Sequence, residues 1–351
     1  MKLKVLAAAS LSLLAITAAG CSPAPAPESS APPAEPGELV VYTSRKEDFV
    51  APLLEKFTAD TGIEVEALYA DDAVINRLKE EAGSPRADVM IGNDAGALEY
   101  LRLQDVLAPV GDIEGIDSID SAYRAADGSW FGLSARTRGL IYNKGLISEA
   151  DVPTTIWELT DPKYKGMFAI TRGGNGSMIA HVSALRAEWD DVRTEEWIRK
   201  TKDNAGAITN GHSDIRKAVG AGEFAFGLVN NYYYHQQLRE PTDNNVGFIY
   251  LDQAEGEMGA VVNAAGVGFV AGGPNLESAR TFAAWVLLPE NQREFSNASL
   301  EVPLNPEVEA PEGTAAIDSY RAHGLPLSRL GEVWEDTRTL IERAGLDLEL
   351  K

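Results

Sequence analysis

Cysteine and histidine are scarce in this chain of 351 residues, which holds one cysteine and four histidines. The single cysteine, Cys21, excludes an intramolecular disulfide and a metal site built from several thiolates. The histidines lack the paired spacing of a zinc motif, and no GxSxG sequence marks a serine hydrolase. No catalytic motif therefore points to an enzyme, and we expect a binding protein.

Basic residues are also few, with 31 Lys and Arg against 53 Asp and Glu, for a formal charge of −22. Removing residues 1–20, which hold two lysines and no acidic residue, makes it −24. This imbalance argues against nucleic acid and anionic membrane surfaces as partners. Solubility alone explains it, although it mildly favours a cationic ligand. We expect the protein to be a monomer.

Long apolar runs are missing except at the N-terminus, where Val5–Ala19 follows Lys2 and Lys4. This run is too short to span a bilayer comfortably and predicts a secretory signal peptide over residues 1–20. The sequence Ala-Ala-Gly before Cys21 resembles the lipobox of bacterial lipoproteins, in which the cysteine is lipidated. We expect a lipid anchor at Cys21 and an exported protein held in the cell envelope. Cleavage without lipidation stays open, because alanine stands where leucine is usual.

Residues 21–37 are rich in Pro, Ala, Ser and Glu. Such a segment buries too little apolar surface to fold, and proline keeps it extended, so we predict a disordered tether. About 310 residues remain, enough for two domains.

From residue 38 onward, short apolar runs alternate with amphipathic segments. This alternation predicts βαβ units in a mostly parallel α/β sheet, with ligands beyond the carboxyl ends of the strands. Strands are predicted at 38–42, 64–69, 87–92, 130–143, 167–170, 224–229, 246–251, 259–262 and 266–270. Helices are predicted at 49–61, 73–81, 95–103, 178–188, 194–202, 214–221, 276–287 and 331–344. The second α/β unit follows the first, so a ligand cleft is expected between them.

Tyrosine makes up only 11 of the 351 residues, yet Tyr232, Tyr233 and Tyr234 are consecutive after the predicted buried strand 224–229. A free phenol has a pKa near 10, and a trivalent cation displaces its proton. Ferric iron is a hard acid that tyrosinate binds. Adjacent phenols converge on one ion if the backbone turns sharply where the strand meets a helix. The alternative is an aromatic patch packed in a core, each hydroxyl being hydrogen-bonded.

The run Leu228–His235 closely resembles the Asn-Asn-Tyr-Tyr segment of periplasmic ferric-iron-binding proteins, the substrate-binding components of iron ABC transporters in the bacterial transferrin-like group. Further similar segments follow the same order, namely 38–44, 57–65, 77–90, 132–144 and 302–306. The resemblance covers about residues 38 to 345. It implies a type II periplasmic binding protein fold with hinge strands between two lobes and a ligand cleft at their interface. Lobe 1 is expected over residues 38–138 and 263–310, and lobe 2 over 139–262 and 311–351.

The resemblance also implies the ligands. Tyr232 and Tyr233 fall on the family's two adjacent ligand tyrosines, and Tyr142 on the further tyrosine that members without a histidine ligand use. Arg45 begins the stretch where many members add a histidine, and Asn93 stands where some add a glutamate. A site of three phenolates for Fe³⁺ is therefore expected to be coordinatively open.

An exogenous anion, carbonate, is expected to complete the site. The candidate partners are Arg45, Arg136 and Arg138, because guanidinium forks suit planar oxyanions. The alternative for Arg136 and Arg138 is an exposed strand face or an interdomain salt bridge. The residues expected to support the ligands are Tyr42, Asn93, Asp94, Asn230, Tyr234 and His235.

Two other functions stay open. One is metal-free binding of a small organic anion, such as a phosphonate or carboxylate, by Arg45 and Arg136. The other is an exported hydrolase that uses Asp71 and Asp72. The leading hypothesis is an extracytoplasmic lipoprotein that captures ferric iron and delivers it to the permease of an ABC importer.

Overall fold

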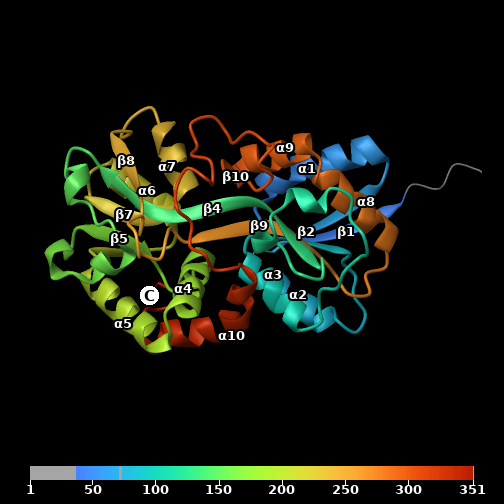
Figure 1. Ribbon diagram of the computed structural model, residues 1–351, viewed down its shortest axis with the longest axis horizontal. Coiled ribbons are helices and arrows are strands. Elements are labelled where there is room, and N and C mark those ends of the chain that lie inside the picture. The colour runs from blue at the N-terminus through green and yellow to red at the C-terminus, as the bar shows by residue number, and fades with distance from the viewer. Residues whose placement is uncertain (1–36, 71–72, 351) are drawn as a thin grey trace, which may run out of the picture. The chain divides into compact units, whose positions relative to one another are not determined.

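The computed structural model describes residues 37–70 and 73–350 (Figure 1). The predicted signal peptide, Cys21 and the tether up to residue 36 lie outside the described residues, as do Asp71 and Asp72. Among the residues that are described, no helix is both long enough and apolar enough to cross a membrane.

The strands of the described residues form one sheet in the order β2-β1-β3-β9-β4-β7-β5-β6, and both β8 and β10 pair with β4. Their bounds are β1 Glu38–Thr43, β2 Glu64–Tyr69, β3 Val89–Gly92, β4 Trp130–Asn143, β5 Phe168–Thr171, β6 Ala207–Thr209, β7 Phe226–Asn230, β8 Val246–Tyr250, β9 Val262–Phe269 and β10 Val302–Pro303. The expectation of a mostly parallel sheet is wrong. The pairs of β1 with β2 and β3, and of β5 with β6 and β7, are parallel, whereas β9 on β3 and every strand on β4 are antiparallel.

The long strand β4 joins the two halves of this sheet. It is buried along its whole length. It pairs with β9 through Thr137, with β7 from Arg138 and with β8 from Gly139. Figure 1 shows β4 and β9 running between a half that holds β1, β2 and β3 and a half that holds β5 and β7. Both strands pair antiparallel with β3, β7, β8 or each other, so these pairings do not follow the parallel βαβ pattern.

Helices cover both halves of the sheet. Their bounds are α1 Glu47–Thr61, α2 Ala73–Glu81, α3 Ala95–Leu103, α4 Gly176–Glu188, α5 Asp191–Asn204, α6 His212–Gly220, α7 Asn231–Leu238, α8 Leu276–Val286, α9 Pro289–Ser299 and α10 Ser328–Arg343. The last of them, α10, contacts both halves. A Cβ on its Gly331 would lie 2.5 Å from Glu99 Cγ of α3, and its Thr337 hydroxyl lies 3.0 Å from that of Ser183 on α4. Helix α10 therefore does not pack on one half alone.

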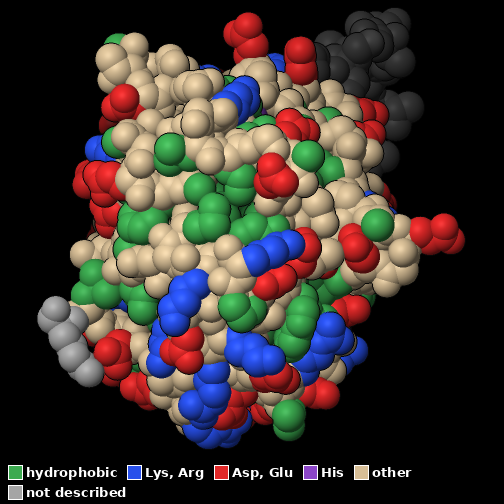
Figure 2. All heavy atoms as spheres, turned by 90° about the vertical axis from the view of Figure 1, so that its left-hand side faces the viewer, with side chains coloured by type: hydrophobic (Ala, Val, Ile, Leu, Met, Phe, Trp, Pro, Cys, Tyr) green, Lys and Arg blue, Asp and Glu red, His purple; other side chains and the backbone are tan. Residues whose placement is uncertain are grey.

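Charges of both signs are interspersed on the face shown in Figure 2, the left-hand side of Figure 1, and hydrophobic side chains gather near its centre. The net charge of −22 is therefore not expressed here as a uniformly acidic surface.

A buried acid after β8 gives the first testable prediction. Asp252 is 7% exposed, has a left-handed φ of 58°, and accepts a hydrogen bond from the Ile156 amide at 3.2 Å. Burial raises its pKa to about 6, although that hydrogen bond and Arg321 oppose the rise. Since the folded pKa exceeds the unfolded one, this carboxyl favours folding below about pH 4 and loses that contribution as the pH rises through 6.

We therefore expect Asp252→Asn to stabilise the protein at pH 7.5, by up to about 3 kcal/mol or several degrees in melting midpoint. The two proteins should melt alike at pH 4, because the wild-type carboxyl is then protonated. Thermal melts at both pH values measure this. Asp243→Asn is the matched control, since Asp243 is exposed and has the same φ of 58°. An equal gain at both pH values would contradict the ionisation as cause.

Candidate functional site

A cavity of 290 Å³ lies where the two halves of the sheet meet. Six of the predicted residues line it, namely Arg45, Asn93, Asp94, Arg136, Tyr232 and Tyr233. Arg45, Asn93 and Asp94 follow β1 and β3, Arg136 lies on β4, and the tyrosines lie on α7. Strand ends of the first half thus contribute one wall, and helix starts of the second half contribute the other, as expected for a ligand site between α/β units.

The two cavity tyrosines sit at a strand-to-helix junction. Strand β7 ends at Asn230 and helix α7 begins at the next residue. The rings of Tyr232 and Tyr233 are 4.4 Å apart between centroids, with an interplanar angle of 33°. Successive helical residues point about 100° apart. Tyr234 accordingly turns away and stacks on Phe248 of β8 at 5.6 Å, where it supports the helix and does not line the cavity.

The Tyr233 phenol is held in its protonated form. Burial raises the pKa of Tyr233, and the neighbouring Tyr232 raises it further by its charge and by hydrogen bonding. Its ring also meets the His212 ring edge-on at 5.0 Å. Any cation that binds this oxygen must therefore displace a proton, so binding releases protons and strengthens as the pH rises.

Arg138 lies buried near the two tyrosines. Its guanidinium donates to the Ser177 carbonyl and, at 2.6 Å, to Nε2 of His212. Because a guanidinium only donates, Nε2 of His212 accepts this bond and the imidazole is neutral. Burial lowers the pKa of Arg138 to about 9, while the Tyr232 and Tyr233 phenols favour its charge. Arg138 thus stays cationic at neutral pH.

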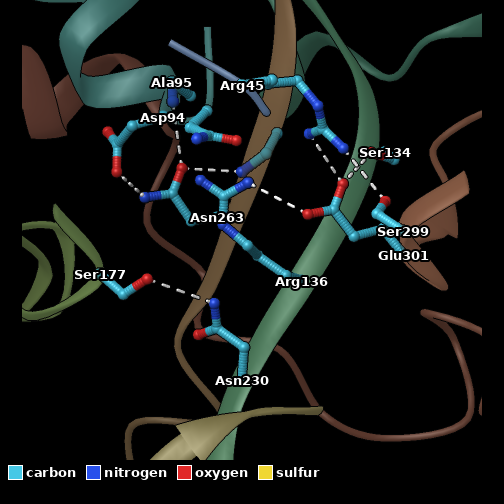
Figure 3. A network of polar contacts seen from close by, with 12 residues as sticks. Arg45, Asp94, Ala95, Ser134, Arg136, Ser177, Asn230, Asn263, Ser299 and Glu301 are labelled. Carbon is cyan, nitrogen blue, oxygen red and sulfur yellow. Dashed lines mark hydrogen bonds and ion pairs between the residues drawn. The ribbon is translucent and has the colours of Figure 1, made fainter. Parts of the chain in front are cut away.

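Glu301 also lines the cavity, and the sequence pattern did not predict this. Figure 3 shows its carboxylate between two arginines, with Arg45 at 3.0 Å and Arg136 at 3.4 Å. The Ser134 hydroxyl donates to it at 2.6 Å, and Ser299 accepts from Arg45 at 3.1 Å. Burial would raise the pKa of Glu301, but the two arginines and Ser134 outweigh it, so the pKa is lowered and the group is ionised.

The predicted anion partners are therefore already engaged within the protein. Arg45 and Arg136 share Glu301, and Arg138 is held by Ser177 and His212. Only one feature of the sequence indicates that Glu301 is buried and paired: it is a lone acid in the mostly apolar stretch 300–304. A charged residue inside such a stretch is buried only when paired.

Asp94 and Asn93 fix the first wall of the cavity. Asp94 accepts from the amides of Gly96 and Ala97 at the start of α3, and its other oxygen accepts from Asn263 at 2.7 Å (Figure 3). The Asn93 amide donates to the Ser44 carbonyl at 2.8 Å. Both residues line the cavity, yet these bonds occupy them as structural supports.

Tyr142 was predicted as a metal ligand, but the structure does not bring it to the cavity. Its side chain lies against Gly247 of β8 and its hydroxyl donates to Glu149 at 2.8 Å, which with burial raises its pKa to about 12. The side chain belongs to the second half of the sheet, four residues along β4 from Arg138. Tyr142 is therefore removed from the expected ligands.

Two of the expected supporting residues also lie elsewhere. The Tyr42 hydroxyl donates to Glu81 at 3.1 Å, and burial of His235 lowers its pKa to about 4; neither residue lines the cavity. Asn230 lies closer to the cavity. Its side-chain amide donates to the Ser177 hydroxyl at 3.4 Å, and its backbone N–H donates to Nδ1 of His212 at 3.4 Å.

The glycine-rich loop before α4 forms part of the cavity wall, as Gly174, Asn175 and Gly176 line it. Asn175 caps α4 by accepting from the Ser177 amide at 3.0 Å. The C-terminal segment holds this loop, since the amides of Gly173 and Gly174 donate to carbonyls of Asp347 and Leu348 at 2.8 and 3.0 Å. No local sequence pattern predicts this contact between distant segments.

Comparison with known proteins identifies the class. Iron uptake protein A1 of Synechocystis is 29% identical over 321 residues, covering 89% of this chain and 88% of that protein. The Fe(3+)-binding periplasmic protein of Serratia marcescens is 28% identical over 257 residues, or 72% and 75% of the two chains. A solved structure of Trichodesmium IdiA (FutA) with iron and citrate ligands matches with a TM-score of 0.78 at 28% identity, covering 89% of this chain and 100% of that one.

The likeness to these proteins confirms the predicted two-lobed binding-protein fold. Residues 53–322 match the bacterial extracellular solute-binding proteins, whose common activity is binding and not catalysis. The prediction that the protein is not an enzyme is confirmed by this match. The chain belongs to the bacterial extracellular solute-binding protein family.

Proposed function

We propose that the protein captures ferric iron outside the cytoplasm, with Tyr232 and Tyr233 as phenolate ligands, and hands it to the permease of an ABC importer. The observation that carries the proposal is the pair of phenols, 4.4 Å apart between ring centroids, in a cavity walled by both halves of the molecule. The named relatives, an iron uptake protein and an Fe(3+)-binding periplasmic protein, support the choice of iron.

Two phenolates leave most positions of a ferric ion open. Oxygen ligands from exogenous anions fill them in this proposal, carbonate being the first choice and a small carboxylate the second. Citrate accompanies iron in the Trichodesmium structure, which supports an anion of this kind. Lys46 and Arg172 also line the cavity and add cationic charge to attract such an anion.

Transport requires the cavity to open and close. Strands β4 and β9 connect the two halves, so a bend within them would move Tyr232 and Tyr233 relative to Arg45 and Asn93. We further propose that the protein acts as a monomer and that lipid at Cys21 keeps it beside its permease.

Selective stabilisation by ferric iron tests the function. Thermal melts are recorded on the mature protein with ferric iron in excess citrate, with citrate alone, and with zinc. A ligand that binds only the native state raises the midpoint, by about 2.7 kcal/mol at a hundredfold excess over its Kd. Of these three additions, we expect only ferric iron in citrate to raise the melting midpoint substantially. An equal rise with citrate in the absence of iron would favour an organic-anion binding protein instead.

A further inference from the structure

Glu301 is a buried carboxylate that the proposed iron chemistry does not use. It is 2% exposed, faces the same cavity as Tyr232 and Tyr233, and receives three donors. Two of these donors are the guanidinium groups of Arg45 and Arg136, which the sequence analysis predicted to bind an oxyanion (Figure 3). Glu301 thus occupies the position that an anionic ligand would otherwise take.

The backbone delivers Glu301 to this position in an unfavourable conformation. Leu300, the residue directly after α9, has a φ of 64°, a left-handed value that is rare for a bulky side chain. The amides of Leu300 and Glu301 both point to the Ser296 carbonyl. Strained residues persist where the surrounding structure requires them and cluster at functional sites.

A tethered carboxylate competes strongly with free anions. Because Glu301 belongs to the same chain as the arginines, its effective concentration at them is that of an intramolecular ligand. A free oxyanion must displace it and leave a buried carboxylate unpaired, which is costly. An anion that bonds to a metal ion on the tyrosines has a partner of its own and need not displace Glu301.

We propose that Glu301 is a built-in anion that prevents Arg45 and Arg136 from binding a free oxyanion, so that the cavity accepts an anion only together with a metal ion. The claim that an anion enters together with a metal ion rests on the proposed function. The claim that Glu301 excludes free anions does not. Glu301 is in this view a specificity-determining residue. It makes the cavity insensitive to free phosphate and free carboxylates.

The test is a gain of anion binding without metal. Glu301→Gln keeps the shape and removes the charge. Bicarbonate, inorganic phosphate and citrate are titrated calorimetrically into metal-free wild type and variant at constant ionic strength. We expect no measurable binding to wild type at millimolar anion and at least tenfold tighter binding of one of these anions to the variant. A merely structural role for Glu301 would not produce this gain.

Glu99→Gln is the matched control. Glu99 is also buried, with an arginine partner, Arg102, at 2.7 Å, but it does not line the cavity. This variant has the same net charge as Glu301→Gln and is expected to bind anions no better than wild type. A gain equal to that of Glu301→Gln would overturn the proposal, since net charge alone would then explain it.

Wild type supplies a second measurement that does not depend on the variant's folding. Anion binding is repeated with and without Ga³⁺, a redox-inert substitute for ferric iron. We expect binding only with Ga³⁺, and binding of an anion to metal-free wild type overturns the inference. If ferric iron and Ga³⁺ do not bind but Glu301→Gln gains anion binding, the proposed iron function fails while the exclusion of free anions by Glu301 stands.

Discussion

Replacing both Tyr232 and Tyr233 by phenylalanine is expected to weaken ferric binding by at least about a thousandfold. A structural Zn²⁺ site with four protein ligands is worth roughly 10–16 kcal/mol. By analogy two phenolates account for several kcal/mol, each 1.4 kcal/mol being tenfold. Phenylalanine keeps both rings and hence the packing on His212. Equilibrium dialysis against a citrate-buffered series of free ferric iron measures the loss.

Tyr142→Phe and Tyr234→Phe are the controls for this experiment, because their hydroxyl groups lie outside the cavity. Each is expected to leave the ferric affinity within about twofold of wild type. Removal of the Tyr142 hydroxyl also frees Glu149, a change expected to affect stability only slightly. A large loss of iron affinity in Tyr142→Phe would contradict the removal of this residue from the ligand set.

Gly266→Ala is expected to destabilise the protein by about 3 kcal/mol and to lower its melting midpoint by about 5 °C. Gly266 of β9 lies between Gly132 of β4 and Gly92 of β3, beside the irregularity in β4 after Gly132. A Cβ here would collide with the Phe131 carbonyl and lie 2.9 Å from the Gly132 Cα, so only backbone movement makes room. Thermal and urea melts measure the cost.

Gly324→Ala is the matched control, since a Cβ at Gly324 meets nothing within 4 Å. It should melt within about 1 °C of wild type. Because β4 and β9 also carry Arg136 and Asn263, Gly266→Ala is further expected to weaken iron binding. A Gly266→Ala protein as stable as wild type would show that the crossing strands are less closely packed than described.

The elements that sequence periodicity predicts best are those whose side-chain pattern follows local structure. The segments 64–69, 73–81 and 95–103 match β2, α2 and α3 to the residue. The helix α9 was missed because Pro289–Ser299 is largely polar and is held by packing, with Phe295 under Arg45. The gap predicted at residues 263–265 is absent, because β9 runs unbroken from Val262 to Phe269.

The site divides in the same way. The place of Tyr232 and Tyr233 beside the cavity could be predicted, because the strand-to-helix junction that orients them is local in sequence. The pairing of Arg45 with Glu301 spans 256 residues, so no local pattern reveals it. Tyr142 was misplaced because a resemblance gives the residue type at a position on a strand, whereas contact with the cavity depends on how far along β4 the cavity extends.

The visible spectrum of the ferric-loaded protein tests the central claim most directly, because tyrosinate bound to Fe³⁺ gives a charge-transfer band. Mature wild type is loaded with ferric iron in the presence and absence of bicarbonate, alongside the variant that carries Tyr232→Phe and Tyr233→Phe. The account predicts a band in wild type, strengthened by bicarbonate, and no band in the variant. Absence of the band from iron-loaded wild type, or its persistence in the variant, would contradict ferric binding by these two phenols.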